Sequence, residues 1–463
     1  MAAIAGIARP GEQDTVVCML EKIAHRGKRG KKLIRSHRAT LLACWQPVEK
    51  QPVPLTLEKQ AVWDGVSAPL PDEDFLVSTK KPFALAAIQG DELLLARDPL
   101  GVKPLYYGKT GGTLVFSSEV KALLSVTQDI HEFPPATVYT TTNGFRRYKK
   151  FHSPTFSGAD ENSLISGLRM RLEQAVLRRI ITDEMGCWLS GGLDSSAIAA
   201  LARPHVRSLH SFVSGVEGAE DLEYGRQMAV HLNTIHHERI VTREEMLHVL
   251  PQVIYHLESF DALLVRSSIT NYLTSEMVAD FTGAVFSGEA GDELFAGYDY
   301  LKSLPTEALP AELEDILMRL HNTALQRVDR CAQANGVIPF VPFTDPDVVD
   351  FALHIPPQLK IYKRGDEIIE KWILRRAVED LLPASVLWRP KAKFWQGAGV
   401  QNLIEEYANQ HVSDADFKRE RQLPNGWVLN TKEELFYYRI FKDHFGELEN
   451  LDWMGRTKGA PLQ

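Results

Sequence analysis

The chain has 463 residues, and 52 Lys and Arg against 60 Asp and Glu give a formal net charge of −8 with the 15 histidines neutral. At about 100–200 residues per domain, this length predicts roughly two to four domains with a sizeable core. Hydrophobic content of 44% with 24% charged residues excludes wholesale disorder and collagen-like architecture, and the negative charge disfavours nucleic acid as the main partner.

The amino terminus and the cysteines predict a cytoplasmic protein with reduced thiols. No apolar run approaches the ~18 residues that a membrane span needs. The first residues contain no basic stretch and reach Arg9-Pro10 before an apolar region forms, so no signal peptide is expected. The cysteines are Cys18, Cys44, Cys187 and Cys331. They lie far apart without a C-x-x-C pair, so we expect neither a zinc site nor a disulfide framework but mostly buried thiols, with Cys18 on the buried face of a helix.

One stretch near the amino terminus is strongly basic. It contains Arg26, Lys28, Arg29, Lys31, Lys32, Arg35 and Arg38, with His25 and His37 at its edges. Two interpretations stay open, a solvated surface face and a site for an anion or RNA. Because no aromatic residue interleaves the charges, the pattern favours the solvated face.

Up to about residue 150, short alternating or apolar runs lie between turn signals. The runs are TLLACW, PFALAAIQ, ELLLARD, GTLVFSSE and ATVYTTTNG. They predict a β-rich domain with antiparallel or mixed strands, and Asp98-Pro99-Leu100-Gly101 and Thr110-Gly111-Gly112 predict turns. The segment 152–163 is rich in Ser, Pro, Gly and Asp and is the expected linker.

Beyond the linker the apolar period becomes helical. Apolar residues recur every four positions from Leu164 to Ile180. Strand patterns (MGCWL, SLHSFV, GAVFSG) then alternate with helical ones (RQMAVHL, MLHVLPQVIYHLE), which predicts a parallel sheet covered on both faces. From about Glu307 the pattern is mainly helical, including AELEDILMRLHNTALQRV and DEIIEKWILRRAVEDLL.

The segment Ser190–Ser196, S-G-G-L-D-S-S, follows the strand MGCWL and precedes an Ala-rich helix. Glycines let the backbone approach a phosphate closely, and the free N–H groups of a loop and helix start point at negative charge. Asp194 would repel a phosphate directly, so a bridging Mg²⁺ is the simplest reason for its presence. A tight turn with a helix cap explains the glycine and serine but not the whole string. The pattern therefore favours phosphate binding, and it is not a Walker A loop.

A second segment, Phe286–Tyr298, follows the buried strand GAVF and gathers three acids among three glycines. Carboxylates beside an anion site indicate metal binding and proton transfer, whereas the non-functional interpretation is an acid-rich turn exposed to solvent. The preceding buried strand favours the first interpretation.

Together these motifs resemble a known family. The S-G-G-L-D-S-S string is similar to the pyrophosphate loop of the ATP pyrophosphatases, and with S-G-E-A-G-D-E it resembles the synthetase domain of asparagine synthetases and, more distantly, β-lactam synthetases. The resemblance covers most of the chain from Arg97 onward. It implies an α/β fold: an N-terminal β-rich amidotransferase-like (Ntn-type) α+β sandwich over 1–152, then a parallel-sheet synthetase domain with a helical C-terminal part over 164–463.

The resemblance also implies site residues. Those implied to contact ATP are Leu189, Ser190, Gly191, Gly192, Asp194, Ser195, Ser196, Val213, Ser214, Ser287 and Gly288. Asp194 and Asp292 match the magnesium-linked acids. Glu289 matches a glutamate of asparagine synthetases where the lactam-forming relatives carry tyrosine, which favours a small attacking amine such as ammonia. Lys391 matches the lysine that neutralises charge as the amine attacks. Lys393 is the alternative candidate for this role, and the non-functional interpretation of both residues is a lysine exposed to solvent.

The amino-terminal domain departs from the family pattern. Glutamine-hydrolysing members carry a nucleophilic Cys directly after Met, where this chain has Ala2. Where the family has an Asn-Gly-Glu segment for glutamine, this chain has Trp63-Asp64-Gly65-Val66-Ser67. Losing the nucleophile and the binding groups together predicts natural loss of glutaminase activity, although a single engineered change would also explain Ala2 alone.

The acceptor side departs as well. The family's substrate spacing is matched by Glu258, Asp261 and Arg266, and Arg327 also has a counterpart. In the segment 336–345, Ile338 replaces a glutamate and Phe340 an arginine. Because two opposite charges are removed together, neither is left buried without its partner, and the fold is expected to tolerate the change. The same change makes aspartate doubtful as the acceptor. A less charged carboxylate is the alternative.

These patterns predict an ATP-dependent carboxylate–amine ligase that forms AMP and pyrophosphate, with ATP and Mg²⁺ as cofactors. Its partners would be a small carboxylate, ammonia or another amine, and a separate ammonia-supplying amidase, while a homodimer follows from resemblance only. The alternatives are an intramolecular, β-lactam-type ligase, which Glu289 opposes, and a non-catalytic nucleotide-binding subunit, which the intact phosphate and metal residues oppose.

Overall fold

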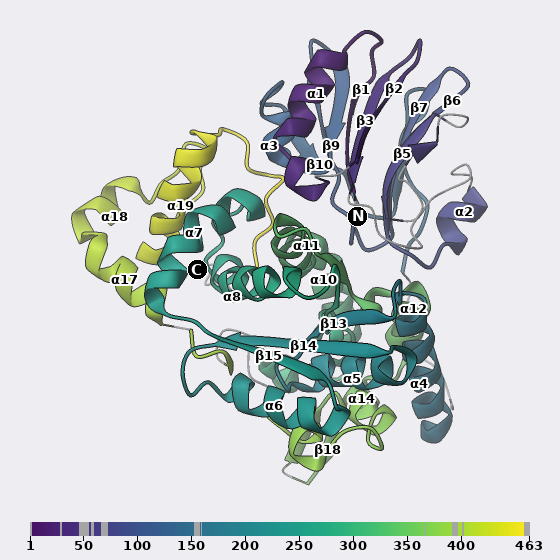
Figure 1. The fold of residues 1–463 in the computed structure, drawn as a ribbon, viewed down its shortest axis with the longest axis vertical. Coiled ribbons are helices and arrows are strands. Elements are labelled where there is room, and N and C mark those ends of the chain that lie inside the picture. The colour runs from purple at the N-terminus through teal and green to yellow at the C-terminus, as the bar shows by residue number, and fades with distance from the viewer. Residues whose placement is uncertain are drawn as a thin grey trace.

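Antiparallel sheets form the amino-terminal part of the structure, and a parallel sheet organises the rest (Figure 1). The computed structural model describes residues 2–27, 30–45, 55–56, 60–65, 73–151, 158, 160–365, 367–390, 397–400 and 402–457. The expected linker at 152–163 falls largely outside these residues. The predicted α/β class, with a β-rich first part, a parallel second sheet and a helical end, is confirmed.

Two six-stranded antiparallel sheets pack face to face in the amino-terminal part. The first sheet has the order β10 (Ile130–Glu132), β8 (Tyr106–Thr110), β9 (Thr113–Ser117), β1 (Ala2–Ile7), β3 (Thr40–Trp45) and β2 (Gly30–Arg35). The second has the order β12 (Gly144–Arg147), β11 (Thr137–Thr140), β7 (Glu92–Arg97), β6 (Phe83–Gln89), β5 (Ala61–Gly65) and β4 (Leu55–Thr56). Every strand pairing in both sheets is antiparallel, and the predicted runs 40–45, 83–89 and 92–97 are strands.

Short helices cover the outer faces of this sandwich. They are α1 (Gln13–Glu21), η1 (Ala24–Arg26), α2 (Glu73–Ser78) and α3 (Val120–Leu123). Between the sheets, apolar residues from β1, β3, β5 and β6 form one core, because alternate side chains of each strand point inward. Beyond the first sheet, α1 and α3 share a second core with helices of the carboxy-terminal half, which joins the two halves through apolar burial.

The parallel sheet has five strands. Its order is β15 (Ile235–Ile240), β14 (Ser208–Gly215), β13 (Glu184–Trp188), β16 (Ala284–Phe286) and β17 (Ile338–Phe340). The inner strands β13, β14 and β16 are mostly buried, as expected for strands covered on both faces. In Figure 1, α8 lies on the side of this sheet that faces the sandwich and α6 on the opposite side.

Helices follow and enclose the parallel strands. In the first half they are α4 (Glu161–Leu177), α5 (Leu193–Ala202), η2 (Arg203–His205), α6 (Glu220–Leu232), α7 (Arg243–Leu257), α8 (Ala262–Ala279) and α9 (Gly291–Phe295). The remaining elements are η3 (Asp299–Ser303), α10 (Leu309–Met318), η4 (Leu320–Asn322), α11 (Ala324–Ala334), η5 (Pro342–Thr344), α12 (Pro346–His354), α13 (Pro357–Lys360), β18 (Ile361–Arg364), β19 (Glu367–Glu370), α14 (Trp372–Ala377), α15 (Ala384–Leu387), α17 (Leu403–His411), α18 (Asp414–Glu420) and α19 (Lys432–Phe445).

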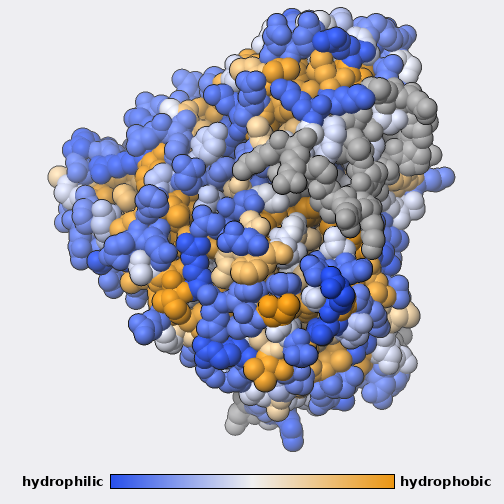
Figure 2. All heavy atoms as spheres, in the orientation of Figure 1, coloured by the Kyte–Doolittle hydropathy of each residue, from blue (hydrophilic) through white to orange (hydrophobic). Residues whose placement is uncertain are grey.

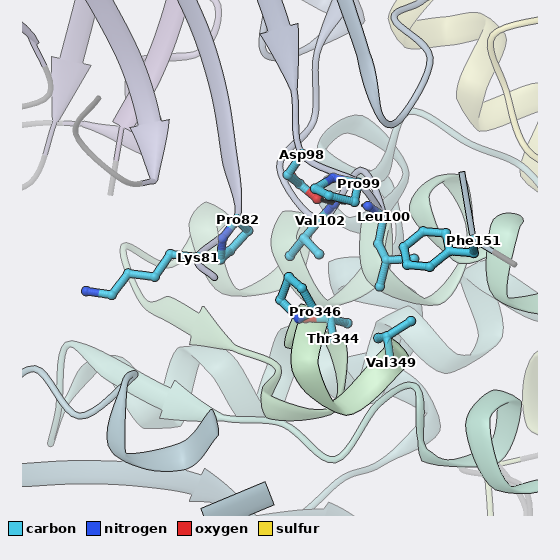
Figure 3. A pocket seen from close by; sticks show the side chains of 10 residues that line it. All are labelled: Lys81, Pro82, Asp98, Pro99, Leu100, Val102, Phe151, Thr344, Pro346 and Val349. Carbon is cyan, nitrogen blue, oxygen red and sulfur yellow. Dashed lines mark hydrogen bonds between the residues drawn. The ribbon is translucent and has the colours of Figure 1, made fainter. Parts of the chain in front are cut away.

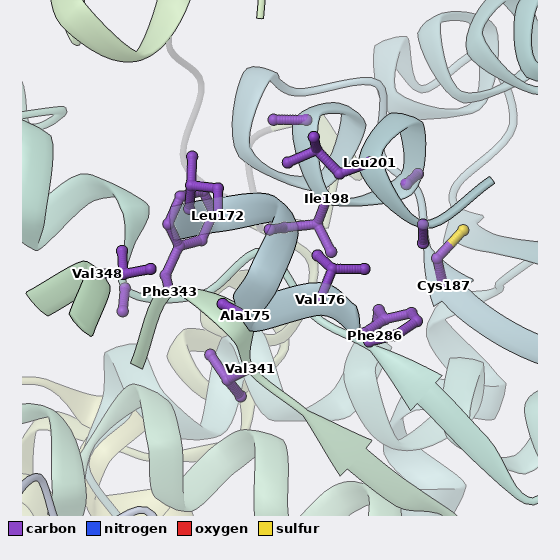
Figure 4. Close-up of a cluster of buried hydrophobic side chains, with 14 of the residues drawn as sticks. Leu172, Ala175, Val176, Cys187, Ile198, Leu201, Phe286, Val341, Phe343 and Val348 are labelled. Atoms are coloured by element: carbon purple, nitrogen blue, oxygen red, sulfur yellow. The ribbon is translucent and has the colours of Figure 1, made fainter. Parts of the chain in front are cut away.

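Helix α4 shows how the predicted period builds the core. Asp160 caps its start by accepting a hydrogen bond from the backbone N–H of Ser163 at 3.0 Å. The four-residue apolar spacing buries Leu172 and Val176 against Ile198 of α5 and Phe286 of β16 (Figure 4). Each large apolar side chain buried in this way contributes about 1.5–3 kcal/mol.

Three expectations of local structure are wrong. DEIIEKWILRRAVEDLL was expected to be helical, but β19 occupies its start. Helix α14 begins only after Lys371, because the left-handed conformation of that residue, with a φ of +56°, cannot be part of a right-handed helix. AELEDILMRLHNTALQRV is divided between α10, η4 and α11, because Thr323 has non-helical backbone angles. Cys18 is exposed, because the apolar face of α1 is formed by Val16, Met19 and Leu20, while the other three thiols are buried and all four are free.

The seam between the sandwich and the second half is closely filled. The predicted turn at Asp98 forms, and its carboxylate accepts backbone hydrogen bonds from Val102 at 3.0 Å and Lys103 at 2.9 Å. Leu100 and the turn then face α12, and the cavity left between them measures about 10 Å³ (Figure 3). That space holds about one water molecule, so the two halves pack without a cleft at this point.

The surface agrees with the charge analysis in most respects. Figure 2 shows a mainly hydrophilic face with apolar residues in small, scattered groups. Within the predicted basic stretch, Lys31, Lys32 and Arg35 are exposed on the edge strand β2, whereas Arg26 is fully buried. Among the described helices, none is long and apolar enough to cross a membrane.

Candidate functional site

The two glycine-rich segments follow neighbouring strands. Strands β13 and β16 pair in parallel, with Cys187 opposite Phe286, so the segments that leave their carboxyl ends emerge side by side. A Cβ added at Gly291 would lie 2.5 Å from Oδ1 of Asp194, which shows how closely the segments approach each other. The structure therefore brings together the two motifs that the sequence predicted to form one site.

The first segment is a tight loop at the start of α5. Gly191 has a φ of +66°, and a Cβ there would lie 2.4 Å from Tyr224, so the loop requires glycine. The Oγ of Ser190 accepts a hydrogen bond from the N–H of Gly192 at 3.3 Å. Arg389, itself paired with Asp221 at 2.8 Å, donates to the carbonyl of Ser190 at 3.0 Å. This bracing holds the loop open at the amino end of a ten-residue helix, where backbone N–H groups face an incoming anion.

Serine hydroxyls line the same helix start. The Oγ atoms of Ser190 and Ser195 lie 3.3 Å apart, and Ser195 also donates to the carbonyl of Gly192 at 3.1 Å. The hydroxyl of Ser196 is fully buried and has no hydrogen-bond partner among the residues that the structure describes. A buried hydroxyl without a partner costs stability unless a ligand satisfies it, so this group supports an anion site here.

The acids of the two segments converge on a lysine. The Nζ of Lys371 lies 2.5 Å from Oδ2 of Asp194 and 2.5 Å from Oδ1 of Asp292. The lysine side chain is 3% exposed, while the two carboxylates are about 15% exposed and border solvent. One ammonium thus bridges both acids that the resemblance assigned to magnesium.

Sequence reasoning missed Lys371. Its run, E-K-W-I-L-R, was interpreted as the interior of a helix, where a lysine is expected on a solvated face. In the structure it is the left-handed residue between β19 and α14, and this conformation turns its side chain inward. No local signal in the sequence marks that conformation, because the residue that favours it is usually glycine.

The donor set fits a magnesium ion that arrives with phosphate. Asp194 and Asp292 offer carboxylate oxygens that meet at one point, which is the ligand type that Mg²⁺ prefers. Among the described residues, no group of three or more His, Cys, Asp or Glu side chains is placed to hold a metal by itself. An ion at this point would therefore need phosphate oxygens for the rest of its ligands, and the Lys371 ammonium would have to share or leave the position.

The second segment also carries two glutamates, Glu289 and Glu293, that lie in different surroundings. Glu289, about one quarter exposed, forms a close ion pair with the guanidinium of Arg327 from α11. Glu293 is buried beside it, and burial together with the charge of Asp292 raises the pKa of Glu293 to about 8. The hydroxyl of Tyr298 donates to Glu293. Glu289 is thus the most exposed carboxylate of this segment, whereas Glu293 is buried and mostly neutral near pH 7.

The other ATP-side residues lie at the same edge of the sheet. Leu189 and Val213 are buried at the carboxyl ends of β13 and β14, and the Oγ of Ser214 lies 2.5 Å from Oγ1 of Thr274. Ser287 is buried, and its N–H donates to the carbonyl of Phe340 at 2.8 Å. Gly288 lies directly against Ser195. Lys391 and Lys393 lie outside the described residues.

Three residues that resemblance assigned to substrate are used differently in the structure. Glu258 is fully buried and accepts backbone hydrogen bonds from Val120 and Lys121 of the sandwich. Asp261 caps α8 and binds Thr457, and Arg266 pairs with Glu433 of α19. The exposed fraction is 0% for both acids and 8% for Arg266, so these side chains are occupied by contacts within the protein, and their role in substrate binding stays a prediction. Of this group only Arg327 reaches the site.

Position 2 lies in a closed environment. Ala2 is 1% exposed, its backbone N lies 3.3 Å from Oδ1 of Asp64, and its carbonyl accepts from Nε of Arg26 at 3.3 Å. Asp64 belongs to the Trp63-Asp64-Gly65 segment noted in the sequence, and it pairs with Arg26 at 3.0 Å. Both charged groups are fully buried, so the space around Ala2 is filled by protein.

Comparison with known sequences gives two family matches. The model described as Asparagine synthase matches residues 167–316 and 307–459, and that described as Glutamine amidotransferase domain matches residues 72–125. An asparagine synthetase of Triphysaria versicolor, described as glutamine-hydrolyzing, is 35% identical over 78% of this chain and 66% of its own length. A similarly described enzyme of Oryza sativa subsp. japonica is 34% identical over 78% of this chain and 65% of its own. A probable asparagine synthetase of Dictyostelium discoideum is 34% identical, with 80% of this chain and 73% of its own covered.

The chain thus spans about two thirds of the length of the curated relatives it matches. Among solved structures, a glutamine phosphoribosylpyrophosphate amidotransferase from B. subtilis matches at 10% identity with a TM-score of 0.27. That match covers 52% of this chain and 65% of the other.

Proposed function

Because the chain belongs to the asparagine synthase family, we propose that it is an ATP-dependent amide-forming ligase that activates a carboxylate as an acyl-adenylate and releases pyrophosphate and AMP. The observation that carries this proposal is the convergence of Asp194, Asp292 and Lys371 beside the Ser190–Ser196 loop. The family match over residues 167–459 supports the same reaction class. The proposed synthetase domain is 164–463, and the proposed amino-terminal domain is 1–152.

In the first half-reaction, an oxygen of the substrate carboxylate attacks the α-phosphate of ATP, and pyrophosphate leaves. We assign the departing pyrophosphate to the N–H groups at the start of α5 and to the hydroxyls of Ser190 and Ser196. Lys371 supplies positive charge at the same point. Asp194 and Asp292 would hold a Mg²⁺ ion that neutralises the phosphate charge.

In the second half-reaction, an amine attacks the carbonyl carbon of the acyl-adenylate, and AMP leaves with the former carboxylate oxygen. Among Glu289, Asp194 and Asp292, Glu289 is the most exposed carboxylate, and its pairing with Arg327 fixes its orientation. We assign to it the proton that the attacking nitrogen loses. Lys391 remains a candidate for neutralising the developing charge, as the resemblance implied.

The acceptor is proposed to be a carboxylate whose remaining part is less charged than that of aspartate. Ile338 is buried on β17, and Phe340 on the same strand is half-buried with its ring 6.2 Å from that of Phe286. Apolar side chains thus stand where the family has a glutamate and an arginine. Arg327 pairs with Glu289 and belongs to α11, which packs against β17, so it suits the reacting carboxylate.

An external amine, with ammonia as the first candidate, is proposed in place of glutamine. Ala2 offers no nucleophile, and the Arg26–Asp64 pair fills the space beside it. The two groups that make the family's glutaminase work, a thiol and an open glutamine pocket, are therefore both replaced. A separate amidase that supplies ammonia would fit this arrangement.

Restoring the thiol is not expected to restore glutaminase activity. In Ala2→Cys, the new side chain would face a space occupied by Arg26 and Asp64, so glutamine would still find no pocket. Glutamate release from glutamine should stay at the background rate of the unmodified chain, measured by a coupled glutamate assay. An enzymatic rate in either protein would overturn the proposed loss.

The ligase proposal is tested by isotope exchange. With ATP, Mg²⁺, labelled pyrophosphate and a panel of small carboxylic acids, an acid that is the substrate should drive label into ATP. No exchange across a broad panel of acids would favour a non-catalytic nucleotide-binding subunit. Product mass then separates the remaining alternative: an intermolecular amide contains the acid plus ammonia minus water, whereas an intramolecular one has lost only water.

A further inference from the structure

A buried ionic network joins the amino-terminal sandwich to α11. At its centre, the fully buried guanidinium of Arg26 donates to both oxygens of Asp329, from Nη1 at 2.6 Å and from Nη2 at 3.3 Å. The same group contacts Glu119 at 2.9 Å and Asp64 at 3.0 Å. Arg26, a residue of the amino-terminal sandwich, therefore makes a bidentate contact with a residue of the second half.

The network is electrically balanced. Its cations are Arg26, Lys103, Lys121 and Arg330, and its anions are Asp64, Glu119, Glu258 and Asp329. Burial opposes the charge of Arg26, but the carboxylates of Asp329, Glu119 and Asp64 raise its pKa well above the usual range. Burial, helped by the charges of Lys121 and Arg26 and opposed by Glu119, lowers the pKa of His25 at the edge of the network, which keeps that ring neutral. Every strong charge in this region has a buried partner of opposite sign.

Helix α11 stands between this network and the site. Asp329 and Arg327 are two residues apart, so their side chains leave the helix about 200° from each other around its axis. Asp329 reaches Arg26 on one side, and Arg327 reaches Glu289 on the other. Helix α11 also packs against η1, which contains Arg26, and against β17, whose Phe340 carbonyl receives the N–H of Ser287.

We infer that Arg26 is a positioning residue for amine attack: its bidentate contact with Asp329 fixes the rotation of α11 at which Arg327 holds Glu289. This inference rests on the proposed ligase function. It gives the amino-terminal domain a role that needs no glutaminase activity, because a buried residue of that domain makes the contact that orients the synthetase site.

A merely structural contact would behave differently. If the network only held the fold together, weakening it would lower stability and reduce both half-reactions alike. If it positions Glu289, the first half-reaction, which uses the loop and Lys371, should be spared while the amine step suffers. The split between the two steps therefore separates the interpretations.

The experiment uses the full chain carrying Asp329→Asn, which keeps the size of the side chain and removes its charge. We expect the KM for ammonium in amide formation to rise about tenfold, as is usual when a coupling contact is weakened, while acid-dependent ATP–pyrophosphate exchange stays within about twofold. Arg26→Lys keeps the positive charge but cannot make the two-oxygen contact, so it should reproduce the same split. The matched control is Lys80→Met, because Lys80 joins the same two halves through Asp347 at 2.7 Å without touching α11.

A measurement without substrate separates this inference from the proposed function. Hydrogen–deuterium exchange of Asp329→Asn should speed up in the peptides covering 324–334 and 287–289, and Lys80→Met should leave both unchanged. Equal losses in both half-reactions, or unchanged exchange in these peptides, would overturn the positioning role. If the unmodified chain shows no acid-dependent pyrophosphate exchange, the ligase function fails, whatever the peptides show.

Discussion

Replacing Lys371 with methionine is expected to reduce acid-dependent ATP–pyrophosphate exchange by about 10²–10³-fold, the usual loss when one preorganised charged donor is removed from a reacting centre. Lys371 is the buried cation that lies 2.5 Å from both Asp194 and Asp292. Without it, the two carboxylates face each other and the departing pyrophosphate loses its positive partner. The exchange rate, measured at saturating Mg²⁺, gives the result directly.

The matched control is Lys302→Met. Lys302 belongs to the neighbouring helical turn and pairs with Glu370 and Asp299 at 3.0 Å, but it does not contact Asp194 or Asp292. Its replacement should leave the exchange rate within about twofold, as expected for a partly exposed ion pair. Thermal melting of both variants excludes unfolding as the cause of a loss. Normal exchange in a folded Lys371→Met protein would contradict the assignment of this lysine to the phosphate site.

Replacing Glu289 with glutamine is expected to separate the two half-reactions. Glutamine keeps an oxygen that accepts from Arg327, but it cannot take a proton from the attacking amine. Amide formation should therefore fall by about 10²–10⁴-fold, the range that general-base groups contribute, while pyrophosphate exchange stays nearly normal. Single-turnover assays of AMP release and amide product measure the two steps in one sample.

Glu293→Gln is the control for this experiment. The pKa of Glu293 is raised to about 8 by burial and by Asp292, so this carboxyl is mostly neutral at pH 7 and glutamine imitates it. We expect amide formation in this variant to change by less than about threefold at pH 7, the scale of a neutral hydrogen-bond change of less than 1 kcal/mol. If Glu289→Gln instead lowers both half-reactions equally, then Glu289 acts in adenylation and the assigned role is incorrect.

The fold was largely predictable because its patterns are local and strong. Alternating runs such as 83–89 became strands, and the four-residue spacing of Leu164 and Leu172 became α4. The failures occurred where distant contacts override local preference. Lys371 adopts a left-handed conformation beside two aspartates from other segments, and its neighbours in the sequence predict neither the conformation nor these contacts.

The candidate site shows the same division. Strand-to-loop motifs predicted the meeting of Ser190–Ser196 with Glu289 and Asp292, because parallel strands end at one edge of a sheet. Motif spacing alone could not show that Glu258 and Arg266 are buried in contacts between elements. It also could not show that Arg26, expected on a solvated face, is fully buried against Asp329, since these residues are about 300 positions apart.

The central claim, that the carboxylate is activated as an acyl-adenylate, is tested most directly by oxygen transfer. The substrate acid is labelled with ¹⁸O in its carboxylate and incubated with the protein, ATP, Mg²⁺ and ammonium, and the nucleotides and phosphates are analysed by mass spectrometry. The account predicts one ¹⁸O atom in AMP and none in pyrophosphate. Appearance of the label in orthophosphate together with ADP would contradict it, because that result requires attack on the γ-phosphate.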